Sequence, residues 1–178
     1  VLTLPLISFY SIHANGWQTF LPVLYAFGLI PALELVLKPD TSNLAEEEEQ
    51  EFLRNRSFDI VVYFSAVFHL FFFSYFFLGR YYGTENWVTW AGRTLTLGLM
   101  CGVFGINIAH ELGHRVKKSE QFLAQVLLMT SLYMHFFIEH NRGHHRYVST
   151  EEDPASAPRN MSLYRFWIRS IVGSYFSA

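Results

Sequence analysis

The stretch FDIVVYFSAVFHLFFFSYFFLG, residues 58–79, holds 22 residues and no charged side chain after Asp59. A helix rises about 1.5 Å per residue, so roughly 20 apolar residues cross some ~30 Å of hydrocarbon. Residues 17–37 and 88–109 form two further apolar runs of similar length, each with a single charged side chain. The three runs therefore predict three membrane-spanning helices.

The composition also favours a membrane protein. Hydrophobic residues make up 51% of the chain and charged residues 16%, whereas soluble domains carry about 25% charged residues. The net charge of −2 gives no sign of a nucleic-acid-binding surface. The single cysteine, Cys101, rules out a disulfide framework and a cysteine-based metal site. We expect an all-α, polytopic transmembrane helix bundle.

The organisation of the chain follows from these spans. Residues 1–13 are apolar but short, and we interpret them as the tail of a truncated span in a fragment of a longer protein. We expect one membrane-embedded domain, truncated at both ends, with the spans in residues 1–109. Lysine and arginine concentrate in residues 38–57 and in residues 110–178, so the positive-inside rule predicts that both regions face the cytoplasm.

Five of the eight histidines lie in two short motifs. HELGH places His110 and His114 four residues apart, and EHNRGHH places His140 and His144 four apart with His145 adjacent. Residues four apart lie on one face of a helix, and neutral imidazole is a common ligand of zinc, copper, iron and nickel. The two motifs therefore predict a metal site.

The motifs alone do not fix the metal. HELGH has the H-E-x-x-H pattern of zinc metalloproteases, in which Glu111 would be the general base. A catalytic zinc takes three protein ligands, so five histidines are too many for one zinc, and their number fits two metal ions. A membrane zinc protease and a histidine-rich metal carrier stay open as alternatives.

Two later segments have helical patterns. Residues 119–138 are apolar enough to span, but a straight helix there would hold the two histidine motifs about 39 Å apart. If the motifs share a site, this segment turns back or lies near the interface, and the sequence leaves both paths open. Residues 161–178 predict an amphipathic helix at the membrane surface, because these side chains fall at helical spacing: Leu163, Phe166, Trp167, Ile171 and Tyr175.

Longer stretches around the histidine motifs resemble the alkane hydroxylases. The similarity is carried by NIAHELGHR (residues 107–115), HFFIEHNRGHHRYVSTEEDPAS (residues 135–156) and LYRF (residues 163–166). That family comprises integral-membrane, non-haem di-iron monooxygenases related to xylene monooxygenase and to membrane fatty-acid desaturases. The resemblance implies a six-helix bundle in the bacterial inner membrane with two iron ions at its cytoplasmic end. The implied iron ligands are His110, His114, His140, His144 and His145.

The resemblance also implies an activity. The family hydroxylates the terminal methyl group of medium-chain n-alkanes with O₂ and with electrons from rubredoxin, which an NAD(P)H-dependent reductase reduces. The alternative within the same superfamily is a desaturase, or a hydroxylase of aromatic methyl groups or fatty acyl chains. The family's third histidine motif lies downstream and is absent from residues 1–178.

Further residues have expected roles in such a site. Asn107, Glu111 and Glu139 flank the histidines and could accept hydrogen bonds from their second ring N–H groups. An n-alkane has no polar handle, so aromatic residues of the spans are candidates for lining its path: Phe27, Phe68, Phe72, Tyr75, Phe104 and Tyr133. Basic residues around the motifs are candidates for docking an acidic electron donor: Arg115, Lys117, Lys118, Arg142 and Arg146.

Overall fold

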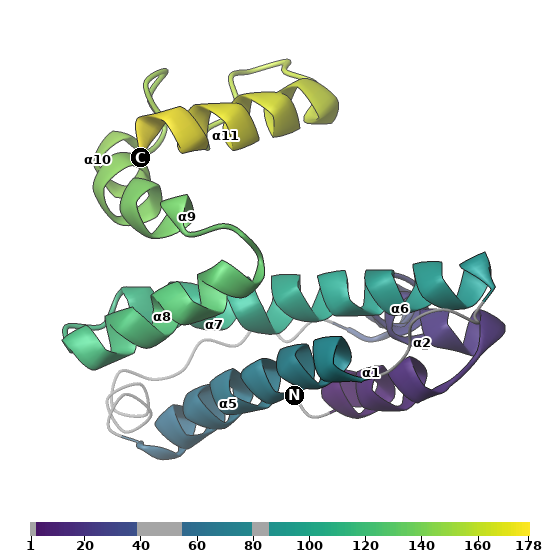
Figure 1. Cartoon of the computed structure of the whole chain (residues 1–178). Coiled ribbons are helices and arrows are strands. Elements are labelled where there is room, and N and C mark those ends of the chain that lie inside the picture. The colour runs from purple at the N-terminus through teal and green to yellow at the C-terminus, as the bar shows by residue number, and fades with distance from the viewer. Residues whose placement is uncertain (1–2, 39–54, 80–85) are drawn as a thin grey trace. The chain divides into compact units, whose positions relative to one another are not determined.

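The structure is a computed structural model that describes residues 3–38, 55–79 and 86–178. Every regular element in these residues is a helix (Figure 1), which confirms the predicted all-α fold. The chain forms two compact units, Val1–Phe104 and Gly105–Ala178. Most of the predicted cytoplasmic loop at residues 38–57 lies outside the described residues, and the prediction of a single domain stays a prediction.

Three helical runs are long and apolar enough to cross a membrane: Gly16–Val36, Ser57–Leu78 and Trp87–Gly113. They match the three predicted spans, and the chain is a membrane protein. The short apolar segment at the N-terminus forms helix α1 (Thr3–His13). The first run comprises the 3₁₀-helix η1 (Gly16–Phe20), α2 (Leu21–Leu24), the π-helix η2 (Tyr25–Leu29) and α3 (Ile30–Val36). The second run is α5 (Ser57–Leu78), and the third comprises α6 (Trp87–Met100), the π-helix η3 (Cys101–Ile106) and α7 (Asn107–Gly113).

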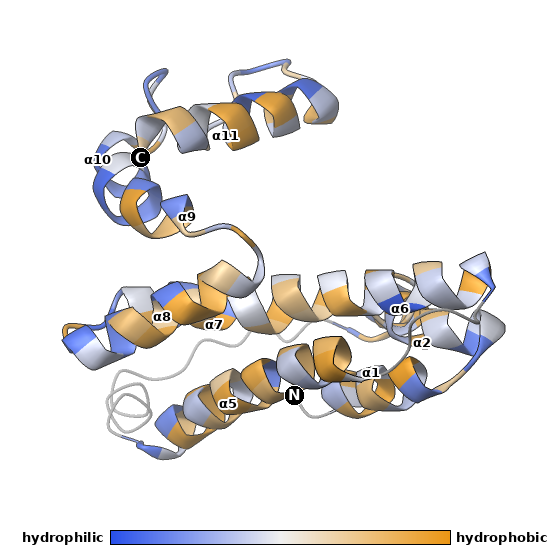
Figure 2. Ribbon diagram, viewed as in Figure 1, coloured by the Kyte–Doolittle hydropathy of each residue, from blue (hydrophilic) through white to orange (hydrophobic). Residues whose placement is uncertain are grey.

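Helix α5 shows how a spanning helix packs in the first unit. Apolar residues occupy it along its whole length (Figure 2). Its buried residues form one narrow face: Ser65, Ala66, His69 and Phe72. Three of these four residues are small or polar, whereas large apolar residues are exposed on the rest of the helix, which is the pattern of helices that face lipid over most of their surface.

Close packing of η1 against α6 joins the first and third runs. Gly92 of α6 faces the side chain of Thr19 and leaves no room for a β-carbon. The Thr96 hydroxyl donates to the Thr19 carbonyl at 2.9 Å, and the Arg93 guanidinium donates to the Ala14 carbonyl at 2.9 Å. These bonds satisfy polar groups inside the protein, as a hydrocarbon surrounding requires.

The second unit begins with a helical hairpin. Helix α7 ends at Gly113, and α8 (Lys118–Thr130) runs back alongside it (Figure 1). Arg115, in the turn between them, pairs with Glu111 of α7 at 3.2 Å and with Glu120 of α8 at 3.1 Å. The side chain of Glu120 is 6% exposed, so this ion pair holds the hairpin at a buried point.

Helix α8 stops well short of residue 138. The Leu132 N–H donates to the Met129 carbonyl and the Tyr133 N–H donates to the Leu128 carbonyl, both at 3.0 Å. This is the Schellman arrangement that ends many helices, with a left-handed residue after the cap. Leu132 occupies that position with φ 53°. The straight helix is therefore excluded, and the chain starts anew at α9.

The histidine motif and the last helix complete this unit. After α8, the second unit contains four further helical elements: α9 (His135–Ile138), the π-helix η4 (Glu139–His144), α10 (His145–Tyr147) and α11 (Leu163–Ser177). Helix α11 confirms the helix predicted at residues 161–178. Its packing face consists of small residues, because Ser174 is buried and Gly173 lies against Pro154. Most of its large apolar side chains are exposed, and its place at a membrane surface stays a prediction.

Candidate metal centre

The second unit brings four imidazole rings together. The Nε2 atom of His110 lies 2.8 Å from Nε2 of His140 and 3.1 Å from Nε2 of His114. The Nε2 atoms of His140 and His114 are 3.2 Å apart, and Nε2 of His145 lies 3.1 Å from Nε2 of His140. The ring nitrogens of His110, His114 and His140 thus all lie within 4.8 Å of one another, and that of His145 lies beside His140, so that rings from both sequence motifs form one cluster.

The local helix geometry explains which histidines meet. His110 and His114 are one α-helical turn apart, so both rings lie on one face of α7 and its C-cap. His140 lies in the π-helix η4, and the His145 N–H donates to the His140 carbonyl, five residues earlier. A π-turn puts residues five apart on one side. His145, rather than His144, therefore joins the nitrogen of His140.

The donor set fits a metal ion. Metal–imidazole bonds of about 2.0–2.1 Å place neighbouring ligand nitrogens of a tetrahedral or octahedral ion roughly 2.8–3.4 Å apart, the range of the distances found here. Burial, together with the neighbouring imidazoles, lowers the pKa of His140 to about 4. The His140 ring is consequently neutral near pH 7, and a neutral ring is the form that binds a metal.

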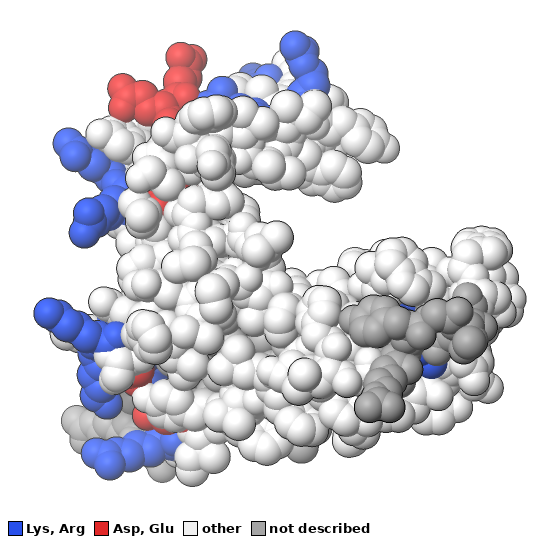
Figure 3. Space-filling model, viewed as in Figure 1, with Lys and Arg blue, Asp and Glu red and all other residues white. Residues whose placement is uncertain are grey.

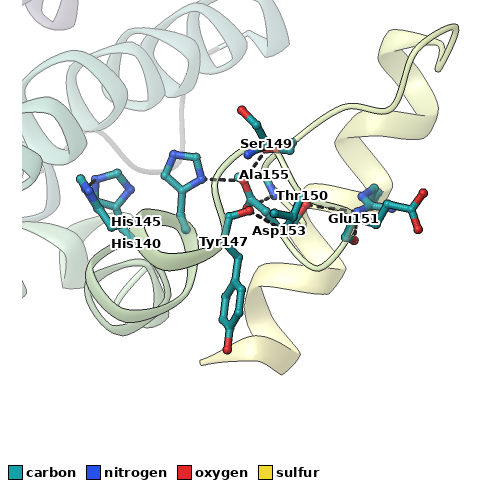
Figure 4. Close-up of polar contacts among 11 residues, drawn as sticks. His140, His145, Tyr147, Ser149, Thr150, Glu151, Asp153 and Ala155 are labelled. Atoms are coloured by element: carbon teal, nitrogen blue, oxygen red, sulfur yellow. Dashed lines mark hydrogen bonds and ion pairs between the residues drawn. The ribbon is translucent and has the colours of Figure 1, made fainter.

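His144 differs from the other four. Its ring centroid lies 5.4 Å from that of His140, but its Nδ1 atom is 2.9 Å from a carboxylate oxygen of Asp153. Figure 4 shows Asp153 among the loop residues that follow His145. Asp153 follows His144 by nine residues, a spacing that gives no sign of this contact.

The three predicted partners of the histidine N–H groups have different surroundings. Asn107 is exposed, and within the described residues no hydrogen bond joins its side chain to an imidazole. Glu111 pairs with Arg115. Glu139 is buried at 3% exposure, and in the described part of the chain its Oε1 atom has no hydrogen-bond partner. Burial, with the nearby Asp153 charge, raises the pKa of the Glu139 carboxyl.

The aromatic residues predicted to line a substrate path do not all belong to one cluster. Phe68, Phe72, Tyr75 and Phe104 belong to one apolar cluster of the first unit, with Met100 and Ile12. The side chain of Phe27 is 73% exposed and lies outside that cluster.

Tyr133, the sixth candidate, belongs to the second unit. Its ring stacks on Phe136 at 5.3 Å between centroids, and Phe136 stacks on His140 at 4.7 Å. Tyr133 is thereby connected to the imidazole cluster through one aromatic ring.

The basic candidates are not equivalent. Arg115 forms ion pairs with Glu111 and Glu120. Lys117 and Lys118, in contrast, are exposed. Arg146 lies over the ring of Tyr147 at 5.1 Å. Arg142 lines a cleft of about 630 Å³ that His114 also borders. Figure 3 shows Lys and Arg side chains exposed on the surface of the molecule.

Comparison with known proteins identifies the family. The sequence model of the fatty acid desaturase family matches residues 85–178, more than half of the chain and the whole region of both histidine motifs. The chain belongs to this fatty acid desaturase family. The four converging imidazoles thus lie in the segment that carries the family relationship.

Curated relatives extend the similarity beyond the matched region. Alkane 1-monooxygenase of Ectopseudomonas oleovorans is 32% identical over 178 residues, which is 98% of this chain and 44% of that protein. Alkane 1-monooxygenase of Pseudomonas putida is 30% identical over 175 residues, 96% of this chain and 43% of that protein. The xylene/toluene monooxygenase hydroxylase component of Pseudomonas putida is 34% identical over 84 residues, 47% of this chain and 23% of that protein. The chain spans less than half the length of the curated relatives it matches.

Proposed function

We propose that the full-length protein is an alkane 1-monooxygenase. It would hydroxylate the terminal methyl group of a medium-chain n-alkane, with O₂ as co-substrate and two non-haem iron ions as cofactor. The observation that carries this proposal is the convergence of four Nε2 atoms from His110, His114, His140 and His145. The named relatives support the choice of alkane as substrate.

The protein's own residues would hold the iron and keep it accessible. The four converging imidazoles would supply neutral nitrogen ligands, and His144 would supply a fifth. When bound, the two irons would supply the activation of O₂ for hydroxylation. Glu139, buried beside His140 with a free carboxylate oxygen within the described residues, is the candidate for accepting an imidazole N–H or holding a proton at that oxygen.

The apolar part of the protein would position the substrate. An n-alkane offers no hydrogen bonds, so only the shape of an apolar surface can orient its methyl end. The aromatic cluster of Phe68, Phe72, Tyr75 and Phe104 is the proposed contact surface. Tyr133, stacked on Phe136 next to the imidazoles of the second unit, is a further proposed contact. Phe27, exposed on η2, is the weakest of these candidates.

The zinc protease fits the geometry less well. Such an enzyme needs Glu111 as a free general base beside a zinc with three ligands. Glu111 instead pairs with Arg115 at 3.2 Å, and four imidazoles converge rather than two from HELGH alone. A desaturase shares the histidine motifs and the family, and it is distinguished by its product. A metal carrier is distinguished by having no turnover.

The cellular setting is part of the same proposal. We place the protein in the bacterial inner membrane with both histidine motifs facing the cytoplasm, because basic residues follow the third span. Rubredoxin, reduced by an NAD(P)H-dependent reductase, would deliver electrons on that side. Exposed Lys117, Lys118 and Arg142 are the proposed contacts for this acidic donor.

The experiment that tests this function uses the full-length protein in membranes. It is supplied with octane, O₂, rubredoxin, its reductase and NADH, and products are analysed by gas chromatography. 1-Octanol is the expected product. Terminal alkenes, or no product from octane but an unsaturated product from a fatty acyl substrate, would show a desaturase instead. A His140→Ala variant should abolish product formation, and a Glu152→Ala variant, altered at an exposed residue outside the two motifs, is the control.

A further inference from the structure

Asp153 is one of the most deeply buried charged residues in the described part of the chain. Its residue exposure is 1%, and its side chain is fully enclosed. One carboxylate oxygen accepts from the Ser156 hydroxyl at 2.5 Å and lies 2.9 Å from Nδ1 of His144. The other accepts from the Ala155 N–H at 2.8 Å. Three donors therefore surround a carboxylate that sits in a short loop (Figure 4).

This arrangement determines the role of His144 Nδ1. The Ser156 hydroxyl and the Ala155 N–H donate to the two oxygens of the Asp153 carboxylate, so both oxygens act as acceptors. An ionised carboxylate can only accept hydrogen bonds. Nδ1 of His144 is accordingly the donor in this contact, which leaves Nε2 as the ring nitrogen that can bind a metal ion.

Helix α11 contacts the loop that carries Asp153. The Arg169 guanidinium of α11 donates to the Glu151 carbonyl at 2.7 Å and to the Asp153 carbonyl at 3.1 Å. Gly173 of the same helix lies so close to Pro154 that a β-carbon would overlap it. Helix α11 thus fixes the backbone from which the carboxylate reaches His144.

We propose that Asp153 is a positioning residue for the metal centre: its carboxylate holds the His144 ring with Nδ1–H bound and Nε2 directed to an iron ion. This inference rests on the proposed function, since it assigns the atom through which His144 binds iron. Metal-binding histidines commonly donate their second ring N–H to a carboxylate, which fixes the tautomer and ring orientation. The competing explanation is an ordinary structural contact that only stabilises the loop.

The test uses the full-length, iron-loaded protein and three variants. Asp153→Ala removes the acceptor, and Asp153→Asn keeps its size and one acceptor oxygen but loses the charge. Glu152→Gln removes an exposed carboxylate from the same loop and is the matched control. Two properties are measured: the rate of iron loss to a ferrous chelator and the Mössbauer spectrum of the iron that remains. Size-exclusion chromatography and thermal unfolding show which variants are folded.

We expect both Asp153 variants to lose iron to the chelator about 10- to 100-fold faster than the wild type, with an altered Mössbauer spectrum, and Glu152→Gln to match the wild type. If Asp153→Ala does not fold, Asp153→Asn decides. A folded Asp153 variant with wild-type iron retention and spectrum would overturn the inference and leave the proposed function intact. A lower melting temperature with an unchanged spectrum would also overturn it, because the contact would then be structural only. Wild-type protein that contains no iron would overturn the proposed function and this inference together.

Discussion

The Nε2 atoms of His110 and His140, thirty residues apart in the chain, lie 2.8 Å from each other. Two ring nitrogens at this distance need either a shared proton or a shared metal ion between them. The contact is possible because the polypeptide between them folds as a hairpin and a capped turn rather than as one helix. Both the hairpin and the capped turn depend on particular residues, and mutations of those residues can test them.

The turn after α8 should become more stable when Leu132 is replaced by glycine. Leu132 is 89% exposed and has a left-handed φ of 53°, which costs an L-residue about 1–2 kcal/mol. Glycine avoids that cost but loses about 0.5–1 kcal/mol in backbone entropy. We expect Leu132→Gly to raise the melting temperature by about 1–4 °C, measured in detergent. Met129→Gly, an exposed change within helix α8, should lower it, and a lower value for Leu132→Gly would contradict the Schellman turn.

Close packing of η1 on α6 predicts a strong difference between two glycines of one helix. A β-carbon at Gly92 would overlap the Thr19 side chain, whereas one at Gly98 meets nothing within 4 Å. Overpacking of this kind costs about 1–3 kcal/mol. Gly92→Ala should therefore reduce the fraction of monodisperse protein that survives heating, and Gly98→Ala should not. Equal survival of the two variants would show that the two helices do not pack as described.

Arg115 is expected to act through the hairpin rather than through an electron donor. Its side chain is 21% exposed and reaches Glu111 and the buried Glu120. Loss of a charged hydrogen bond to a largely buried group costs about 1–3 kcal/mol. Arg115→Gln should lower the melting temperature clearly, while Lys117→Gln, at an exposed position of the same turn, should leave it unchanged. A melting temperature for Arg115→Gln equal to that of the wild type would contradict this structural role.

We expect the exposed residues Lys117 and Lys118 to affect binding of the electron donor. Lys117→Gln combined with Lys118→Gln is expected to raise the KM for rubredoxin a few-fold at low salt, with kcat nearly unchanged, because surface charges mainly steer encounter. Added salt screens these charges over about 8–10 Å and should remove the difference. An unchanged KM at low ionic strength would show that the donor binds elsewhere.

Much of the fold could be predicted because each span depends on local composition. The apolar runs at residues 17–37, 58–79 and 88–109 are detectable without any tertiary contact. The π-helices are different: α-helical spacing pairs His140 with His144, but η4 changes the turn and brings His145 to His140. The sequence EHNRGHH alone does not distinguish an α-helical turn from a π-helical turn.

Two further features depend on contacts that spacing does not reveal. Leucine is an unusual residue for a left-handed cap, so no glycine marked the end of α8. Asp153 follows His144 by nine residues through an irregular loop, and helical or strand periodicity has no meaning there. Helix α11, predicted from its apolar spacing, packs through its small residues, since most of its large apolar side chains remain exposed.

The iron content of the full-length protein tests the central claim most directly. Protein purified from cells grown with iron is analysed by elemental mass spectrometry, as wild type and as the His140→Ala variant. The proposed di-iron function predicts about two irons per wild-type chain, and the position of His140 among His110, His114 and His145 predicts a large loss of iron in the variant. One zinc and no iron in the wild type, or full iron content in a folded His140→Ala variant, would contradict the account.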